Sequence, residues 1–592
     1  MTKAEHPLPA QQHAGAARKA EGFATPRQDQ KPQCARMLPK RVLPIIFLPG
    51  IMGSNLRMSE ERQRELKQKD NIAWRPDTLD PSSPSIITGA ANETPAERQL
   101  RLDPLQTTVD IYDPSGLGSS VGDDRHGNVE LDKNFQSPFL TNDPTTMPKG
   151  LTAAQKARAR GWGEVYFKSY GQLLQHLESR LNSIFSEGKL RTEWSDVVGV
   201  DPQKWGSDPK LPQKKLTEEE LKKLVTGCWF AIYAFGYNWL QSNGDSAKII
   251  AARINKVIDD LTKLGYECNQ VVVVTHSMGG LVGRALIHPK FGNLQDKVLG
   301  IVHGVMPAIG APAAYRRMRA GFEDPGLLSF SRAAIEASVA AKVAGNYGDE
   351  VTAVLANAPG GLQLLPSEAY GNGWLRVQQN GRDLESWPKK GDPYNEIYKV
   401  KGKWYSLFRE NWINPSRVDP REGGGTFTRT CEYLNVAQGF HRMISSTYHP
   451  NSYAHYGADK ERRSFNEIVW EISNCTDPSG WQNWPILEDT KQGRLKLVDW
   501  DTNGVNNIAP LPFNDAASAP VYATILPPTA PGDQTVPVKS ADHQLHSGSF
   551  KGVFRQTGYE HQSSYKDLRA VAATLYSIVR IAQSATWQCA KD

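Results

Sequence analysis

One serine in the sequence occupies a position suited to nucleophilic chemistry. Ser277 follows an unbroken apolar run over residues 271–274 and precedes Gly279 and Gly280. A short apolar run bounded in this way predicts a buried strand, and the residues after it predict a helix. This strand–turn–helix pattern is typical of a nucleophile elbow, in which the serine hydroxyl projects above the edge of a sheet. Thr275 stands where such an elbow usually has its first glycine, and we expect its modest size to fit.

A general base for Ser277, and an acid to orient that base, must come from later in the chain. A serine hydroxyl is a weak nucleophile on its own. In proteins with such an elbow, the triad residues occur along the sequence in the order serine, acid, histidine. Asp533 lies in a loop bounded by proline and glycine, and His561 lies just before the last amphipathic helix. Both loops follow apolar stretches, so we expect them at the carboxyl edge of a parallel sheet, where ligands bind. The sequence therefore predicts a catalytic triad of Ser277, Asp533 and His561.

Other histidines and aspartates fit these two roles less well. Some histidines stand too close to Asp533, one precedes every candidate acid, and others fall in a region that we assign to a cap. Two aspartates precede the strand that leads to Asp533. These alternatives are His303, His441, His449, His455, His543, His546, Asp499 and Asp501.

A second loop offers hydrogen-bond donors for the negative charge that develops during ester attack. An apolar strand over residues 42–48 runs into residues 49–54, which read Pro-Gly-Ile-Met-Gly-Ser. In enzymes with a nucleophile elbow, two backbone N–H groups donate hydrogen bonds to the oxyanion. One belongs to the residue after the serine, and the other to the loop that follows an early strand. We therefore predict an oxyanion hole built from the backbone N–H groups of Met278 and Ile51.

Strands and helices alternate around these loops. Strands are predicted at residues 42–48, 229–235, 271–275 and 298–303, and helices at 162–185, 247–264 and 279–287. Alternation of this kind indicates βαβ units and a mostly parallel sheet flanked by helices. The predicted fold class is therefore α/β, in the form of an α/β hydrolase fold.

The first half of the chain contains an arm and most of this core. Residues 1–40 lack hydrophobic periodicity and are expected to form a flexible arm. Residues 41–310 hold the first part of the core, interrupted by a polar, turn-rich insertion at about 57–160. A charged linker is expected over 204–223.

The second half contains a large inserted region and the end of the core. Residues 311–510, with a helix expected at 331–344, break the alternation and are assigned to a cap or lid. Residues 511–592 complete the core through strands at 521–526 and 552–554, followed by a helix at 565–581.

Composition and charge exclude several classes of function. The net charge of the 592 residues is +6, and no basic run is interleaved with aromatic residues, so we expect no nucleic-acid partner. The six cysteines are scattered without a Cys-x-x-Cys pair, which argues against zinc but leaves disulfides in the C-terminal half open. Residues 499–504 read like the start of a calcium loop, yet Pro510 stands where an EF-hand needs Glu. We expect no cofactor and an Asx-rich turn at these residues, with a calcium site of another geometry as the alternative.

The N-terminal residues have no apolar stretch of the kind that a secretory signal needs, and no run predicts a transmembrane helix. We therefore expect synthesis in the cytoplasm without a cleaved signal peptide. The protein either stays there or leaves through a machine that needs no such signal.

Five segments of the sequence resemble lecithin–cholesterol acyltransferases and GPI inositol-deacylases. Those families carry a Pro-Gly-x-x-Gly-Ser loop, a Tyr-Asp-Trp motif, a His-Ser-Met-Gly-Gly elbow and a Gly-Asp-Gly-Thr-Val-Pro acid loop. The corresponding segments here are residues 47–56, 237–239, 275–280, 532–537 and 560–561. The chain departs from the pattern at Asn238, which replaces an Asp, and at Gln534, which replaces a Gly beside the acid.

The whole architecture, with no signal peptide, polar insertions and a large cap, looks most like bacterial type VI secretion lipase effectors of the deacylase-like branch. The resemblance implies a serine lipase that hydrolyses membrane phospholipids through an acyl-enzyme, an antibacterial toxin acting in the periplasm of target bacteria. It also implies a cognate immunity protein and delivery by a type VI spike protein. Two alternatives stay open: an acyltransferase that uses an alcohol acceptor, and an inactive hydrolase scaffold that binds a partner.

Overall fold

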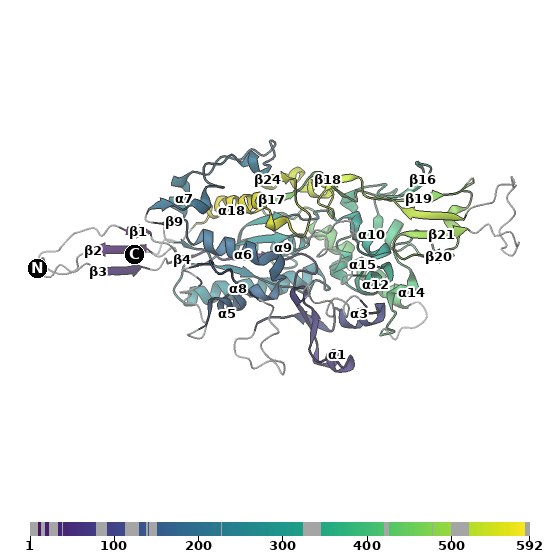
Figure 1. Ribbon diagram of the computed structural model, residues 1–592, viewed down its shortest axis with the longest axis horizontal. Helices are drawn as coiled ribbons and strands as arrows, with labels where there is room; N and C mark the ends of the chain where they lie inside the picture. The colour runs from purple at the N-terminus through teal and green to yellow at the C-terminus, as the bar shows by residue number, and fades with distance from the viewer. Residues whose placement is uncertain are drawn as a thin grey trace, which may run out of the picture.

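A computed structural model of the chain is shown in Figure 1. The structure describes residues 40–78, 92–112, 129–137, 140, 151–186, 188–225, 228–323, 345–418, 425–475, 477–498 and 520–586. It also describes three short strands nearer the N-terminus, β1 (Ala10–Gln12), β2 (Arg18–Gly22) and β3 (Gln33–Met37). These three strands pair antiparallel in one small sheet, inside the stretch that the sequence assigns to an arm.

A six-stranded sheet forms the centre of the molecule. In the order in which neighbours pair, its strands are β12 (Ile232–Ala234), β5 (Ile45–Leu48), β13 (Val271–His276), β14 (Val298–Gly304), β17 (Ser452–Gly457) and β24 (Phe550–Gln556). Every pairing in this sheet is parallel. The short strands β4 (Arg41–Val42) and β11 (Cys228–Trp229) also pair in parallel. The predicted α/β class with a mostly parallel sheet is confirmed.

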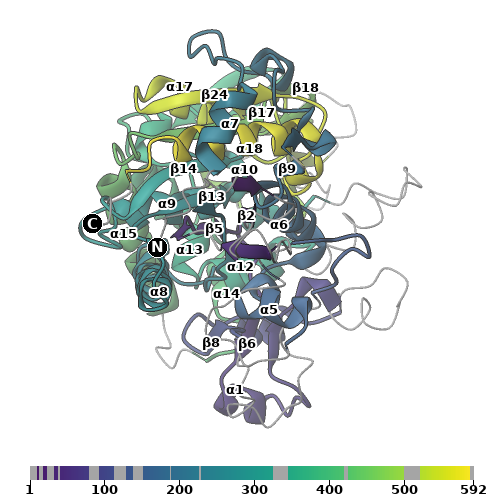
Figure 2. The same cartoon turned by 90° about the vertical axis from the view of Figure 1, so that its left-hand side faces the viewer.

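Helices cover both faces of the central sheet. They are α8 (Asn243–Lys263) and α9 (Gly279–Ile287) on one face, and α6 (Phe167–Leu181) and α18 (Leu568–Ala582) on the other (Figure 2). In β13, Val271 and Val273 pack in the core of the first face, and Val272 and Val274 pack in the core of the second. Because successive side chains of a strand point to opposite faces, a sheet covered on both sides needs the unbroken apolar run that the sequence shows.

A second six-stranded sheet lies at the right-hand end of Figure 1. Its strands, in pairing order, are β16 (Arg382–Trp387), β15 (Leu375–Gln379), β19 (Ile468–Ser473), β22 (Val521–Ile525), β21 (Arg494–Val498) and β20 (Glu488–Asp489). The larger helices of this part are α10 (Pro312–Ala320), α12 (Gly348–Leu355) and α15 (Gly425–Ile444).

Two strands lie in a different sheet from the one that the sequence predicts. The strand predicted at 521–526 as a return to the core is β22, which pairs antiparallel with β19 in the second sheet. The central sheet is instead continued by β17, which lies inside the range assigned to the cap. The burial of these two strands does not follow their sequence patterns. β22 is only half-buried, whereas all six residues of β17 are buried although the strand contains serine and histidine. The assignment of 521–526 to the central sheet is therefore wrong.

The polar insertion at 57–160 contains its own small sheet, visible at the bottom of Figure 2. Its antiparallel strands, in pairing order, are β7 (Ile72–Trp74), β6 (Leu56–Met58) and β8 (Thr107–Val109). The helices of this region are α1 (Glu60–Glu65), α3 (Pro95–Arg101) and α5 (Ala153–Ala159). The expected linker at 204–223 contains most of a helix, α7 (Glu218–Val225), and follows a 3₁₀ turn that starts at Pro202. The helix expected at 331–344 and the candidate calcium loop at 499–504 lie outside the described residues.

The other described strands and α-helices are short. They are the strands β9 (Phe185–Ser186), β10 (Lys189–Leu190), β18 (Asp459–Ser464) and β23 (Ala530–Gly532), and the helices α13 (Pro359–Leu362), α14 (Glu410–Ile413), α16 (Val538–Ala541) and α17 (His543–His546).

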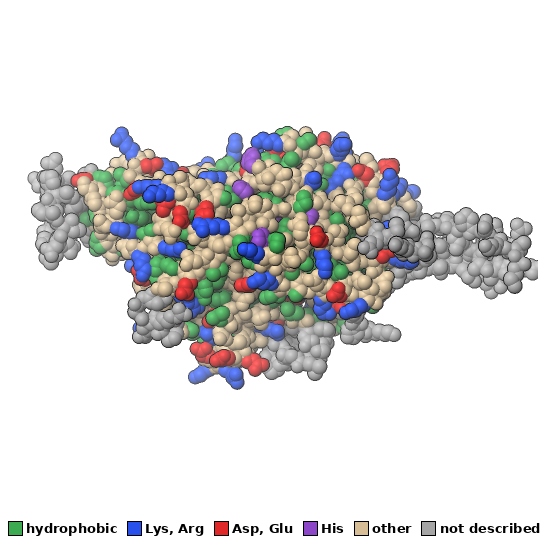
Figure 3. Space-filling view, turned by 180° about the vertical axis from the view of Figure 1, so that it is seen from behind, with side chains coloured by type: hydrophobic (Ala, Val, Ile, Leu, Met, Phe, Trp, Pro, Cys, Tyr) green, Lys and Arg blue, Asp and Glu red, His purple; other side chains and the backbone are tan. Residues whose placement is uncertain are grey.

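Cysteines and surface charge complete the description. Cys228, Cys268, Cys431 and Cys475 are free thiols. Basic and acidic side chains are interspersed over the face seen in Figure 3, in keeping with the small net charge. Among the described helices, none is both long and apolar enough to cross a bilayer.

Candidate active site

Ser277 lies at the turn between β13 and α9, as the sequence predicts. Its φ of 52° is in the left-handed region, which is uncommon for residues other than glycine and typical of a sharp, strained turn. Gly279 shows how tight the turn is, because a Cβ atom there would stand 2.5 Å from the carbonyl oxygen of Leu48 and 2.4 Å from that of Pro49. The first turn of α9 therefore packs directly on the end of β5.

Thr275 fits at the position where the elbow usually has glycine because its neighbour on α9 has no side chain. A Cβ atom at Gly283 would lie 3.2 Å from the Thr275 methyl carbon. The Thr275 hydroxyl lies 3.4 Å from Nδ1 of His303. The substitution that the sequence shows is thus accommodated by the helix behind it.

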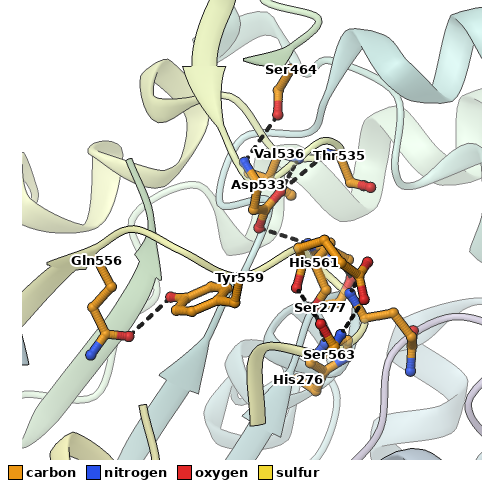
Figure 4. Close-up of polar contacts among 12 residues, drawn as sticks. His276, Ser277, Ser464, Asp533, Thr535, Val536, Gln556, Tyr559, His561 and Ser563 are labelled. Carbon is orange, nitrogen blue, oxygen red and sulfur yellow. Dashed lines mark hydrogen bonds and ion pairs between the residues drawn. The ribbon is translucent and has the colours of Figure 1, made fainter. Parts of the chain in front are cut away.

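The structure brings the three predicted triad residues together (Figure 4). Ser277 Oγ lies 2.8 Å from His561 Nε2, and His561 Nδ1 lies 2.8 Å from Asp533 Oδ2. All three residues are buried, with 5%, 8% and 1% of their surface exposed. A hydroxyl, an imidazole and a carboxylate in this order can pass a proton from the hydroxyl to the imidazole and stabilise the imidazolium that results.

Asp533 is fixed by backbone contacts on its other oxygen. Its Oδ1 accepts hydrogen bonds from the backbone N–H of Val536 at 2.7 Å and of Thr535 at 3.1 Å, which leaves Oδ2 for His561. The Asp533 N–H donates to the hydroxyl of Ser464 in β18, and its carbonyl accepts the N–H of His561. The acid loop and the histidine loop are thus joined through backbone as well as side chains.

The loop over 49–54 lies against the elbow, as an oxyanion loop should. A Cβ atom at Gly50 would stand 3.0 Å from the Cβ of Ser277, so only glycine allows this approach. The predicted donors, the N–H groups of Ile51 and Met278, have no hydrogen-bond acceptor among the described residues. Neither amide is therefore used by another contact among the described residues, as an oxyanion hole requires.

Two aromatic side chains from elsewhere in the sequence hold the loop over 49–54. The Tyr237 hydroxyl donates to the carbonyl oxygen of Pro49 at 2.8 Å. Trp74 Nε1 donates to the carbonyl oxygen of Met52 at 2.7 Å. Asn238, which replaces the Asp of the related motif, donates through Nδ2 to the Thr107 carbonyl at 3.0 Å. The insertion at 57–160 is thereby attached to the core and supports the site through Trp74.

Sequence reasoning missed two buried residues beside the triad, Tyr170 and His276. The Tyr170 hydroxyl lies 3.0 Å from His276 Nδ1, and His276 Nε2 lies 3.0 Å from the carbonyl oxygen of His561. Burial lowers the pKa of His276 to about 3 and raises that of Tyr170 to about 12, so both are neutral near pH 7. The helical spacing around Tyr170 indicates only a core position, so the sequence carries no signal for this contact.

Four of the histidines considered as alternative general bases make other contacts in the described part of the chain. His303 contacts Thr275, His441 contacts Tyr394, His543 contacts Tyr448, and His449 accepts the N–H of Asn451. Asp499 and Asp501 lie outside the described residues. Within the part of the chain that the structure describes, no three His, Cys, Asp or Glu residues are grouped as a metal site would require.

Comparisons with known proteins give one informative result. Neither the protein-family models nor the curated proteins that were compared match the chain. Among solved structures, the crystal structure of the Tle4–Tli4 complex is similar, with a TM-score of 0.69 and 30% sequence identity. The similarity covers 92% of this chain and 99% of the matched chain, so it extends over the core, the insertion and the second sheet alike.

Proposed function

The chain belongs to the Tle4 family of type VI secretion lipase effectors, and from this premise we propose that it is a serine phospholipase that hydrolyses membrane phospholipid esters. The observation that carries the proposal is the hydrogen-bonded line from Ser277 through His561 to Asp533. The backbone amides of Ile51 and Met278, on the two neighbouring loops, have no acceptor among the described residues.

In the proposed mechanism, Ser277 Oγ attacks the ester carbonyl carbon while His561 Nε2 takes the hydroxyl proton. Asp533 keeps the imidazole in the tautomer that can accept this proton, and stabilises its charged form. The amides of Ile51 and Met278 bind the oxygen that becomes negative. His561 then gives the proton to the departing lysophospholipid alcohol, which leaves an acyl group on Ser277. Water, deprotonated by the same imidazole, releases the fatty acid and restores the serine.

We further propose that the enzyme is an antibacterial toxin that acts in the periplasm of target bacteria. The similar structure is a complex of Tle4 with Tli4, which supports a cognate immunity protein as a partner of this chain. Delivery by a type VI spike protein is part of the same proposal.

The test compares wild type, Ser277→Ala and the control Ser195→Ala on vesicles of phosphatidylethanolamine and phosphatidylglycerol. Ser195 is an exposed serine on a 3₁₀ turn of the chain, so its loss checks for unspecific effects. Mass spectrometry measures released fatty acid and lysolipid. We expect release by wild type and Ser195→Ala but not by Ser277→Ala. Equal release by Ser277→Ala would overturn the proposal, and a dominant new ester on addition of an alcohol would establish the acyltransferase alternative.

A further inference from the structure

The Tyr170 hydroxyl contacts three of the four loops that carry the proposed catalytic groups, all but the loop of Asp533. It lies 3.0 Å from Nδ1 of His276, the residue before Ser277. It accepts the N–H of Gly50, the residue before Ile51, at 3.4 Å. It also accepts Nε2–H of Gln562, the residue after His561, at 3.3 Å. Tyr170 is fully buried on α6, behind the reacting atoms.

The direction of each hydrogen bond follows from the groups present. The His561 carbonyl oxygen can only accept, so His276 must carry its proton on Nε2 and donate it there. Nδ1 of His276 is then an acceptor and takes the single hydroxyl proton of Tyr170. The Tyr170 oxygen is left to accept from Gly50 and Gln562. Every donor in this set therefore has an acceptor, and one placement of the protons satisfies all of these hydrogen bonds.

The packing around the pair is tight. A Cβ atom at Gly50 would stand 2.8 Å from His276 Nδ1, and one at Gly53 would stand 2.9 Å from the Tyr170 hydroxyl. The Tyr170 ring packs on Phe47, with ring centroids 4.9 Å apart. Because neighbours are in contact on every side, a shift of Tyr170 or His276 would displace the loops that touch them.

We propose that Tyr170 and His276 are positioning residues that set the spacing between the serine, the general base and the oxyanion loop. Neither touches the ester: Tyr170 acts through His276 and Gly50, and His276 acts through the backbone of His561. This inference rests on the proposed function, because it assigns a role within that catalytic site. Small errors in the placement of catalytic groups reduce kcat strongly, which makes the role measurable.

The test uses the rate of reaction of Ser277 with a fluorophosphonate, which needs no knowledge of the lipid headgroup, and kcat and KM on a short-chain ester. Tyr170→Phe removes only the hydroxyl and keeps the ring on Phe47. We expect kcat and the labelling rate to fall roughly ten- to a hundredfold while KM changes by less than about threefold.

Two substitutions of His276 separate its two contacts. In His276→Gln the amide nitrogen reaches the place of Nε2 and keeps the donor to the His561 carbonyl. In His276→Asn the amide oxygen takes the place of Nδ1 and keeps the acceptor for Tyr170. We expect His276→Gln to retain more activity than His276→Asn. Adding Tyr170→Phe to His276→Gln should cost less than it does in wild type, because the contact that Tyr170→Phe deletes is already lost.

The matched control is Tyr398→Phe, which removes a fully buried hydroxyl that donates to the Pro366 carbonyl away from the triad. We expect it to lower the melting temperature about as much as Tyr170→Phe does but to leave the labelling rate unchanged. A normal labelling rate and kcat in Tyr170→Phe, or an equal slowing by Tyr398→Phe, would overturn the inference alone. Failure of the wild type to react with the fluorophosphonate would overturn the proposed function and the inference with it.

Discussion

At the level of single residues, the geometry of the site depends on which hydrogen-bond partner each polar atom has. Asp533 uses one carboxylate oxygen for the backbone amides of Thr535 and Val536 and the other for His561. The carboxylate is therefore oriented before substrate arrives. Preorganisation of this kind reduces the entropy and reorganisation that the reaction itself must overcome.

Gln534, next to the acid, has backbone dihedrals that favour glycine. Its φ is 70°, and its side chain is exposed. We expect Gln534→Gly to raise the free energy of unfolding by about 1 kcal/mol, because glycine adopts this conformation without a Cβ penalty and no packing is lost. Chemical denaturation of both proteins measures the difference.

Gln534→Ala is the control for that substitution, since it shortens the side chain but keeps the Cβ atom. It should give no gain in stability. A gain as large as that of Gln534→Gly would show that the side chain, rather than the backbone, destabilises the loop.

At the scale of elements, the elbow is fixed by the contact between α9 and the end of β5. Gly279→Ala would place a Cβ atom within 2.5 Å of two backbone carbonyl oxygens, and backbone cannot move aside cheaply. We expect this substitution to lower the free energy of unfolding by roughly 2–4 kcal/mol. Hydrolysis should fall as well, because Ser277 and Met278 would be displaced.

Gly439→Ala is the matched control on another helix. Gly439 lies within α15, and a Cβ atom there would meet no atom within 4 Å. The same chemical change should raise the free energy of unfolding by roughly 0.5–1 kcal/mol, as alanine favours a helix over glycine. If Gly279→Ala were equally harmless in denaturation and in ester hydrolysis, the tight contact at the elbow would be refuted.

The elements also differ in how far the sequence predicts them. Apolar residues dominate the strands β5, β13 and β14, which end in glycine-rich or polar loops, so both their burial and the position of the site at their ends follow from the pattern. The buried strand β17 could not be recognised, because a strand with serine and histidine looks half-exposed until its tertiary partners are known. The contact between Tyr170 and His276 joins residues 106 positions apart, which no local pattern encodes.

At the scale of the whole molecule, the central sheet contains three buried histidines at the carboxyl ends of neighbouring strands. They are His276 on β13, His303 on β14 and His455 on β17. Burial lowers the pKa to about 3 for His276 and His303 and to about 4 for His455. An unfolded histidine titrates near 6.5, so between these values the unfolded chain binds protons that the folded chain does not. The protein should therefore lose stability as the pH falls below 6.5.

His455→Leu tests this account of acid sensitivity. Among the described residues, neither ring nitrogen of His455 has a hydrogen-bond partner, so leucine removes a titrating group without breaking a contact of that kind. We expect the dependence of the unfolding free energy on pH between 4 and 6 to become shallower by up to about 1.4 kcal/mol per pH unit. The exposed His546→Leu serves as control and should leave the slope unchanged. An unchanged slope in His455→Leu would contradict the assignment of this histidine.

The proposed function requires that one serine performs the hydrolysis of phospholipid. The most direct measurement titrates the protein with a long-chain fluorophosphonate, and follows both the labelled residue by peptide mass spectrometry and the release of lysolipid from phosphatidylethanolamine vesicles. We predict one label per chain, on Ser277, with lysolipid release falling in proportion to the labelled fraction. A label on another residue, or full labelling of Ser277 with lysolipid release undiminished, would contradict the account.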